Sequence, residues 1–233
     1  VKREWLNFAN ATESQFAEFV QGRGDIICKP IDGSSGQGIC KCTPEDYKDV
    51  QALYERLKAA GIGIVEDKVI QHEAIAALCP TSVNTIRVAT LLGDKKEGIV
   101  YAYIRIGNGK VMDNVDCGGM AAPINLDTGV ISGVGANKAG ETYEFHPMTG
   151  KRIPGTQIPY WEEVKTMCLK AMHVVPQVRF VAWDVAITPD GPVFIEGNSF
   201  PSHAIPQFAA HFPDGIGTVS YTHLRAHETD SYL

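Results

Sequence analysis

The sequence predicts an α+β protein made of two α/β lobes. From Asp25 to Glu73 the pattern is strand, glycine-rich turn, strand, helix and strand, which makes a compact first lobe. Beyond Pro80 the strand segments become longer and are joined by turns, as in a second, sheet-rich lobe. With 233 residues and 44% hydrophobic residues, the chain is long enough for two lobes with a real core.

A capping box opens the first predicted helix. Thr12 is followed three residues later by Gln15 and by apolar residues at helical spacing, so a short amphipathic helix is expected from about Thr12 to Gly22. The chain begins with Val1 rather than methionine, which suggests that upstream sequence is missing. We therefore interpret residues 1–24 as an N-terminal helix that remains from a larger N-terminal region.

The first lobe is expected to span residues 25–73. Residues 25–30 are predicted as a buried strand, residues 39–42 as a second strand, 43–61 as a helix and 63–71 as a third strand. The turn between the first two strands consists of small and polar residues, namely Gly33, Ser34, Ser35, Gly36, Gln37 and Gly38. Backbone amides of such a loop can approach phosphate oxygens, and Lys29 precedes it, but an ordinary glycine-rich hairpin is an alternative.

The second lobe is expected to span residues 74–218. Strands are predicted at 83–92 and 98–106, followed by a long loop excursion at 107–159 with a short strand near 120–124. A helix begins at Pro159, and a β-hairpin follows it. Residues 219–233 lack apolar periodicity and contain His223, Arg225, His227 and Glu228. A metal site there is conceivable, but we interpret the segment as a non-native or disordered tail.

The predicted hairpin places two carboxylates opposite each other. Its strands contain Asp184 and Glu196, and Pro189-Asp190-Gly191 is read as a three-residue turn that makes Thr188 face Pro192. Like charges at opposite positions repel each other, and a cation would relieve that repulsion. The alternative is that one carboxylate faces solvent or that the two share a proton.

Asn198 extends this pair of carboxylates to three oxygen ligands. It lies two residues beyond Glu196 and therefore points to the same face of the strand as Glu196. Oxygen ligands without His or Cys suit Mg²⁺ or Mn²⁺ held beside phosphates. Asp184, Glu196 and Asn198 are the predicted metal ligands.

Composition excludes several classes of protein. The formal net charge of −6 argues against a general nucleic-acid binder. No apolar run approaches the ~20 residues of a membrane-spanning helix, and no signal-peptide pattern is present. The six cysteines, Cys28, Cys40, Cys42, Cys79, Cys117 and Cys168, form no CxxC pair and no disulfide framework. They are therefore interpreted as reduced thiols, mostly in the core, of a cytoplasmic protein.

Several motifs, taken in order, resemble the ATP-grasp superfamily. They are Cys28-Lys29-Pro30 with the glycine-rich loop, the stretch Ile64 to Glu73, and Asp184 with Glu196-Gly197-Asn198. The stretches Ser82 to Arg87 and Asn114 to Gly119 are similar to its sugar-transfer-associated, glutamate-ligase-like branch. The resemblance covers about residues 25–210. It implies an ATP-grasp fold with the nucleotide between the two lobes.

The resemblance also implies roles for individual residues. Lys29 would contact nucleotide phosphates, and the loop containing Ser34, Ser35, Gly36, Gln37 and Gly38 would close over them. Adenine would be held by Glu66, Asp67, Lys68 and Val69, and the ribose by Glu73. Mg²⁺ would be held by Asp184, Glu196 and Asn198. These enzymes usually have a further nucleotide-binding lysine upstream of the position of Lys29, for which no confident equivalent exists here.

The implied activity is an ATP- and Mg²⁺-dependent carboxylate–amine ligation that releases ADP and phosphate through an acyl phosphate. The substrates would be a small carboxylate and an amine, such as glutamate joined to a sugar-linked or cell-surface precursor. Arg87, Arg105 and Arg179 are candidates for contacting the γ-phosphate, although ordinary ion pairing on a sheet face is an alternative. A phosphotransferase and a non-catalytic nucleotide-binding module remain alternative functions. The sequence does not indicate the oligomeric state.

Overall fold

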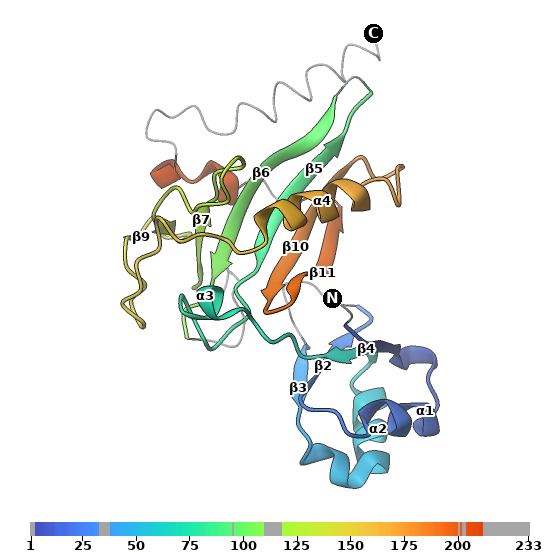
Figure 1. Ribbon diagram of the computed structural model, residues 1–233. Coiled ribbons are helices and arrows are strands. Elements are labelled where there is room, and N and C mark those ends of the chain that lie inside the picture. The colour runs from blue at the N-terminus through green and yellow to red at the C-terminus, as the bar shows by residue number, and fades with distance from the viewer. Residues whose placement is uncertain are drawn as a thin grey trace. The chain divides into compact units, whose positions relative to one another are not determined.

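The computed structural model describes residues 3–32, 38–94, 96–109, 118–199, 201 and 204–211. The chain divides into two compact units, Val1–Val69 and Ile70–Leu233, called unit 1 and unit 2 below (Figure 1). The predictions on Gly33 to Gln37, on Asn114 and Cys117, and on the 219–233 tail lie outside the described residues.

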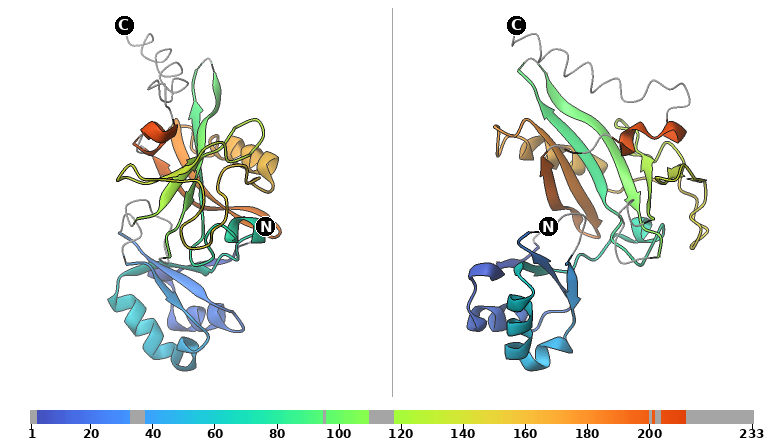
Figure 2. Two further views of the ribbon diagram at one scale, coloured as in Figure 1. Left: turned by 90° about the vertical axis from the view of Figure 1, so that its left-hand side faces the viewer. Right: turned by 180° about the vertical axis from the view of Figure 1, so that it is seen from behind.

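Unit 1 contains a four-stranded antiparallel sheet with the order β1-β4-β2-β3. Its strands are β1 (Trp5–Asn7), β2 (Ile26–Pro30), β3 (Cys40–Cys42) and β4 (Ile62–Asp67). Its α-helices are α1 (Glu13–Val20) and α2 (Val50–Ala59), and both lie on the same side of the sheet (Figure 2). Phe16, Leu53 and Leu57 of these helices pack with Ile26 and Val65 of the sheet in one buried core.

Side-chain caps decide where the two helices begin. The predicted capping box is confirmed, because the Thr12 side chain accepts from the Gln15 backbone and the Gln15 side chain accepts from the Thr12 backbone. The predicted start of the second helix at residue 43 is wrong. Asp46 accepts hydrogen bonds from the backbone and hydroxyl of Thr43 and opens a short 3-10 helix, η2 (Asp46–Asp49). Asp49 then caps α2 at the backbone of Ala52.

Unit 2 is built on a seven-stranded antiparallel sheet with the order β11-β10-β5-β6-β7-β8-β9. The strands are β5 (Ile86–Leu92), β6 (Glu97–Ile106), β7 (Met120–Pro123), β8 (Gly135–Ala136), β9 (Thr142–Tyr143), β10 (Phe180–Thr188) and β11 (Gly191–Ser199). The helices are α3 (Glu73–Ala76) and α4 (Trp161–Ala171), with the 3-10 helices η4 (Ile205–Gln207) and η5 (Ala209–His211).

Both faces of this sheet are covered in its central part. Helix α4 contacts β5, β6 and β11, and its Trp161, Val164 and Cys168 join the largest buried core (Figure 1). On the opposite face, Ile205 and Phe208 pack against a second cluster that includes Tyr101 and Tyr103 of β6. One face of the sheet is therefore apolar, while the other combines an apolar part with the polar residues described below.

Most predicted elements of both units are present with changed boundaries. Strand β4 ends at Asp67 rather than continuing to residue 71, and β5 begins at Ile86 rather than at residue 83. The predicted loop excursion contains the expected strand β7 and also two short strands, β8 and β9, that were not predicted. Helix α3, strand β1 and the 3-10 helix η1 (Phe8–Asn10) were also missed. None of the described helices combines the length and the apolar character needed to cross a membrane.

Candidate functional site

The predicted pairing of Asp184 with Glu196 is confirmed, although the predicted turn is wrong. Thr188 pairs with Gly191, so the loop has two residues rather than three. With this turn alone, Asp184 would face Ile195 rather than Glu196. A β-bulge at Ile195 inserts one unpaired residue, because Val185 pairs with Phe194 and Asp184 pairs with Glu196. The bulge thus restores the opposition of the two acids.

Two arginines pair with Asp184. Asp184 is fully buried. Arg87 Nε and Nη2 lie 2.7 Å from Asp184 Oδ1 and Oδ2, and Arg105 Nη2 lies 2.7 Å from Oδ2. The contact with Arg87 is the bidentate arrangement that makes arginine–carboxylate pairs strong and directional.

The sheet register explains how these side chains meet. On neighbouring strands Asp184 pairs with Arg87, and Arg87 pairs with Tyr103. Arg105 lies two residues beyond Tyr103 and therefore points to the same face. Its guanidinium also donates to the Thr85 hydroxyl at 2.7 and 2.9 Å, which fixes its position. The cluster is therefore held by three adjacent strands rather than by loops.

The charged forms of these buried groups are stabilised by one another. Burial alone would raise the pKa of Asp184, but the hydrogen bonds from Arg87 and the charges of Arg105 and Arg87 lower it below its ordinary value. Burial likewise opposes the charge of Arg87, yet its hydrogen bonds and attraction to Asp184 raise its pKa. Asp184 is thus an anion at neutral pH.

Glu196 and Asn198 complete the cluster on β11. The Asn198 side-chain amide lies 3.5 Å from Asp184 Oδ2 and 3.3 Å from Glu196 Oε1. Glu196 is exposed, in agreement with the alternative in which one carboxylate faces solvent. The structure therefore brings together Asp184, Glu196, Asn198, Arg87 and Arg105, called the Asp184 cluster below.

Arg179 lies elsewhere in the sheet. Its guanidinium contacts Asp94 at 2.8 Å and the Leu92 carbonyl at 2.8 Å, next to the turn between β5 and β6. Five residues of extended strand separate Arg179 from Asp184, which is about 17 Å at the usual rise per residue. Arg179 is therefore not part of the Asp184 cluster.

Unit 1 contains a second group of predicted site residues around Glu66. The Glu66 carboxylate lies 2.8 Å from Lys29 Nζ and 3.0 Å from Arg3 Nη2, and the residue is only 6% exposed. Lys29 and Glu66 come from neighbouring strands, β2 and β4, and face the same side of the sheet. Lys29, which is predicted to bind phosphate, and Glu66, which is predicted to bind adenine, are therefore in contact.

The other predicted nucleotide-binding residues have separate surroundings. Asp67 is paired with Arg23 at 2.7 Å, and Lys68 with Asp25 at 3.1 Å. Val69, at the end of unit 1, is half-buried. Glu73 is exposed at the first position of α3 in unit 2.

Gly38 stands at the end of the glycine-rich loop with φ +76°, where an added Cβ would come within 3.2 Å of Pro30. A residue with a side chain would be strained at this position. The glycine is therefore required by the backbone itself.

Tyr103 and Arg3 belong to these two groups but were not predicted. The Tyr103 hydroxyl is buried beside Arg87. The spacing of Tyr103 and Arg105 on one strand would have indicated a shared face. Arg3 carries no such signal, because its role depends on the unpredicted pairing of β1 with β4.

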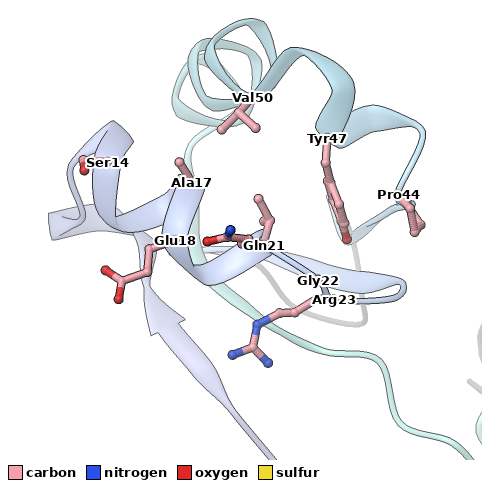
Figure 3. A pocket seen from close by; sticks show the side chains of 10 residues that line it. Ser14, Ala17, Glu18, Gln21, Gly22, Arg23, Pro44, Tyr47 and Val50 are labelled. Carbon is pink, nitrogen blue, oxygen red and sulfur yellow. The ribbon is translucent and has the colours of Figure 1, made fainter.

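A separate hollow of about 680 Å³ lies in unit 1 between α1 and the η2–α2 segment (Figure 3). Its lining includes Glu18, Gln21, Arg23 and Tyr47. None of the predicted site residues lines it.

The Asp184 cluster fits a hard divalent cation by its chemistry. Asp184 and Glu196 offer carboxylate oxygens, and Asn198, whose amide already faces both, offers a neutral oxygen after rotation of the amide. The carboxylates of Asp184 and Glu196 and the guanidiniums of Arg87 and Arg105 together have a formal charge of zero. A cation added there leaves a positive cluster, which suits a polyphosphate.

The comparisons with known proteins agree with this fold. The chain resembles a D-cycloserine synthetase with a TM-score of 0.52 and 11% identity, covering 98% of this chain and 64% of that one. It also resembles the biotin carboxylase domain of Hydrogenobacter thermophilus 2-oxoglutarate carboxylase, crystallised with MgADP, ADP and bicarbonate. That match has a TM-score of 0.51 and 16% identity, and it covers 92% of this chain and 39% of that one. At such identities the likeness establishes the fold alone.

The match to a sequence family is more extensive. No protein among those with curated descriptions matches the chain. The family described as sugar-transfer associated ATP-grasp matches residues 5–213, which cover most of both units and include every predicted site residue. The chain has the ATP-grasp fold and belongs to the sugar-transfer-associated ATP-grasp family.

Proposed function

We propose that this chain is the ATP-grasp part of an ATP- and Mg²⁺-dependent ligase that joins a carboxylate to an amine. The carboxylate would belong to an amino acid such as glutamate, and the amine to a sugar-linked or cell-surface precursor. The observation that carries the proposal is the Asp184 cluster, which combines two carboxylates, an amide and two arginines on one sheet face of an ATP-grasp chain.

Asp184, Glu196 and Asn198 would hold the metal in this proposal. When bound there, Mg²⁺ would neutralise phosphate oxygens and orient the γ-phosphate for in-line transfer. Asp184 is kept anionic by its arginines and would not need to lose a proton first. Glu196 is exposed and can turn toward a ligand without leaving a buried site.

Arg87 and Arg105 are our candidates for contacting the transferred phosphoryl group. Their guanidiniums are held by hydrogen bonds over one face of β5 and β6. Little reorganisation is therefore needed when charge develops on phosphate oxygens. The substrate carboxylate would attack the γ-phosphate and release ADP, and the amine would then displace phosphate from the acyl phosphate. Arg179 is a weaker candidate because it lies about 17 Å along the chain from Asp184, beside Asp94.

The nucleotide would be bound by residues of unit 1 and the start of unit 2. Lys29 and the loop containing Ser34, Ser35, Gly36, Gln37 and Gly38 would contact the phosphates. Glu66 to Val69 would hold the adenine, and Glu73 the ribose. The contact of Lys29 with Glu66 supports this assignment, because a nucleotide passing along this sheet face would meet both residues.

The remaining parts of the proposal concern the whole protein. The chain spans 64% of the D-cycloserine synthetase and 39% of the carboxylase domain that it resembles. We propose a first nucleotide-binding lobe at 25–73, onto which residues 1–24 pack as part of unit 1, and a second lobe at 74–218. Small-molecule substrates and a cytoplasmic location are part of the same proposal.

Thermal denaturation with and without ATP, each with and without Mg²⁺, tests the nucleotide site. A ligand at about 100 times its Kd stabilises by about 2.7 kcal/mol, which is readily measured as a rise in Tm. We expect the Mg²⁺-dependent part of this rise to be lost in Glu196→Gln. Glu97→Gln is the matched control, since Glu97 is an exposed acid in the same sheet and should leave the rise unchanged.

Product analysis tests the chemistry. A ligase releases ADP only when both a carboxylate and an amine are present, whereas a phosphotransferase needs a single acceptor. ATP binding without turnover under any acceptor pair would support a nucleotide-binding module instead. If neither this chain nor a longer one containing it gains stability from ATP and Mg²⁺, the proposal fails.

A further inference from the structure

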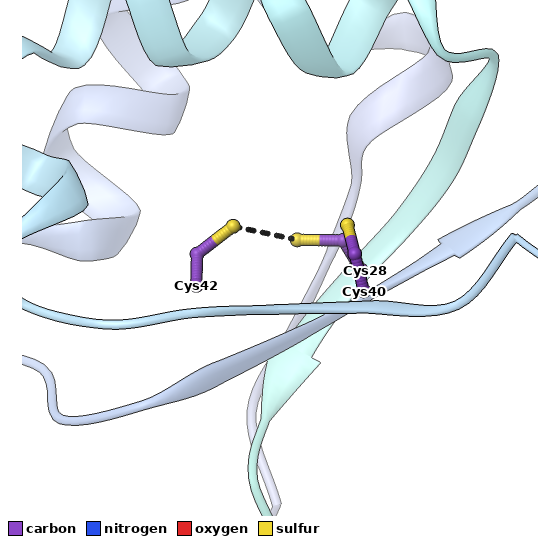
Figure 4. Close-up of side chains that lie close together, drawn as sticks. All are labelled: Cys28, Cys40 and Cys42. Atoms are coloured by element: carbon purple, nitrogen blue, oxygen red, sulfur yellow. Dashed lines mark hydrogen bonds between the residues drawn. The ribbon is translucent and has the colours of Figure 1, made fainter.

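Three cysteine side chains of unit 1 converge at one point of the sheet. Cys28 lies on β2, and Cys40 and Cys42 lie on β3. In the antiparallel register Cys28 pairs with Cys40, and Ile26 pairs with Cys42, so all three thiols face the same side. Their sulfur atoms lie within 4.8 Å of one another. Figure 4 shows the three side chains in close-up.

The spacing of the sulfurs suits shared ligation of one ion. Cys28 Sγ and Cys42 Sγ are 3.7 Å apart. Two thiolates bound to Zn²⁺ at about 2.3 Å with a tetrahedral angle are about 3.8 Å apart. A disulfide would require the two sulfurs to approach to about 2.05 Å, and it would leave the third thiol without a role.

The surroundings of the three thiols allow entry of an ion and balance of its charge. Cys28 and Cys42 are buried, whereas Cys40 is exposed and gives access from solvent. Arg56 of α2 lies near enough to the Cys42 thiol for its charge to act on it, and it also pairs with Asp46 at 3.1 Å. One Zn²⁺ with three thiolates carries a charge of −1, and the Arg56 guanidinium, whose charge Asp46 shares, offsets part of that charge.

We propose that Cys28, Cys40 and Cys42 form a binding site for one thiophilic metal ion, with Zn²⁺ as the ion that we commit to. Three thiolates supply soft ligands, and water completes a four-coordinate shell on the exposed side. This site is separate from the Asp184 cluster, because it uses sulfur rather than oxygen ligands and lies in the other unit.

The position of the site gives it a structural consequence. Cys28 directly precedes Lys29, and Cys40 follows Gly38 by two residues, so the site lies where the glycine-rich loop leaves β2 and enters β3. A bound ion would tie these two strands together at the base of that loop. Metal binding should therefore slow amide hydrogen exchange in β2 and β3 more than in β10.

Titration of the fully reduced chain with Zn²⁺ and with Cd²⁺, under anaerobic conditions, tests the proposal. We expect one equivalent of either ion to bind, with thiolate-to-metal charge-transfer absorption for Cd²⁺. Cys28→Ser, Cys40→Ser and Cys42→Ser should each weaken binding by at least about tenfold. Cys168→Ser is the matched control, because Cys168 is a buried thiol of unit 2 outside the cluster and should leave the titration unchanged.

Cys40→Ser distinguishes loss of metal binding from loss of folding. Cys40 is exposed, so this variant should keep the circular dichroism spectrum and the Tm of the metal-free chain. The proposal is overturned if Cys40→Ser binds Cd²⁺ with the same affinity and the same absorption as the wild type. It is also overturned if no stoichiometric binding occurs in the reduced chain, or if the purified protein contains a disulfide between two of these cysteines that survives mild reduction.

Discussion

Among the residues that the structure describes, each unit contains one buried carboxylate paired with two cations, but the two arrangements differ in how tightly they are enclosed. In unit 2, the Asp184 side chain has no exposure, and Arg87 and Arg105 are 12% and 13% exposed. In unit 1, the Glu66 side chain is 8% exposed, and its partners Lys29 and Arg3 are 21% and 19% exposed. The first arrangement has three contacts of 2.7 Å, and the second has contacts of 2.8 and 3.0 Å.

This difference separates a carboxylate that fixes its cations in place from one whose lysine partner can move. The bidentate contact of Arg87 and the contacts of Arg105 with Asp184 and Thr85 fix both guanidiniums on the sheet, which is the arrangement that our proposed phosphate-contacting role requires. A lysine on a flexible stem can leave one partner for another at low cost, because its ammonium reaches water easily.

Asp184→Asn should lower the free energy of unfolding by about 3–5 kcal/mol, because it leaves two buried guanidiniums without their counter-charge. Chemical denaturation in a Trp5→Phe background would measure this effect, since the remaining tryptophans, Trp161 and Trp183, both lie in unit 2. A loss below about 1 kcal/mol would mean that water already reaches the arginines and that the cluster is not rigid.

Arg87→Lys keeps the charge but loses the fork that contacts both oxygens of Asp184. We expect a loss of about 1.5–3 kcal/mol, the value of a hydrogen bond to a charged group. The same denaturation assay measures it. Arg105→Lys should cost less, because Arg105 contacts a single oxygen of Asp184 and its other hydrogen bonds go to the neutral hydroxyl of Thr85. Equal losses for the two variants would contradict the importance of the bidentate geometry.

Glu66→Gln should lower the stability of unit 1 by about 1–3 kcal/mol, because its two cationic partners are partly solvated and lose only part of their stabilisation. Hydrogen exchange would show the effect as faster exchange in β2 and β4 with unchanged exchange in β10. A loss as large as that of Asp184→Asn would show that the two arrangements are energetically alike.

Asp94→Asn should change the free energy of unfolding by no more than about 1 kcal/mol, since Asp94 and Arg179 are 69% and 37% exposed. The Mg²⁺-dependent rise in Tm with ATP should also be unchanged. Loss of the rise in this variant would contradict the separation of Arg179 and Asp94 from the nucleotide site.

The hairpin shows how a correct prediction can rest on a wrong intermediate step. Asp184 and Glu196 were expected to oppose each other through a three-residue turn, but the turn has two residues and a bulge at Ile195 compensates. Turn residues indicate that a hairpin exists more reliably than they indicate its register. The bulge has no distinct signal in the sequence, because Ile195 is an apolar residue like Val193 and Phe194 before it.

Local features were predicted well where a short-range interaction decides them. The capping box at Thr12 and Gln15 depends on residues three positions apart, and it fixed the start of α1 as expected. Strand β1 was missed because its three residues, Trp5 to Asn7, are a strand only through pairing with β4, nearly sixty residues later.

The fold class, most of the strands and helices, and the residue types suited to a metal beside phosphates follow from the order of the amino acids. Which charges meet depends on how the strands are arranged in the folded chain. Asp184 is 97 residues from Arg87 and 79 from Arg105, and the order of the strands brings them together. The contact of Lys29 with Glu66 and the convergence of the three thiols have the same origin. Local propensity governs elements within a few residues, whereas side chains on neighbouring strands meet only after the sheet order and register are set.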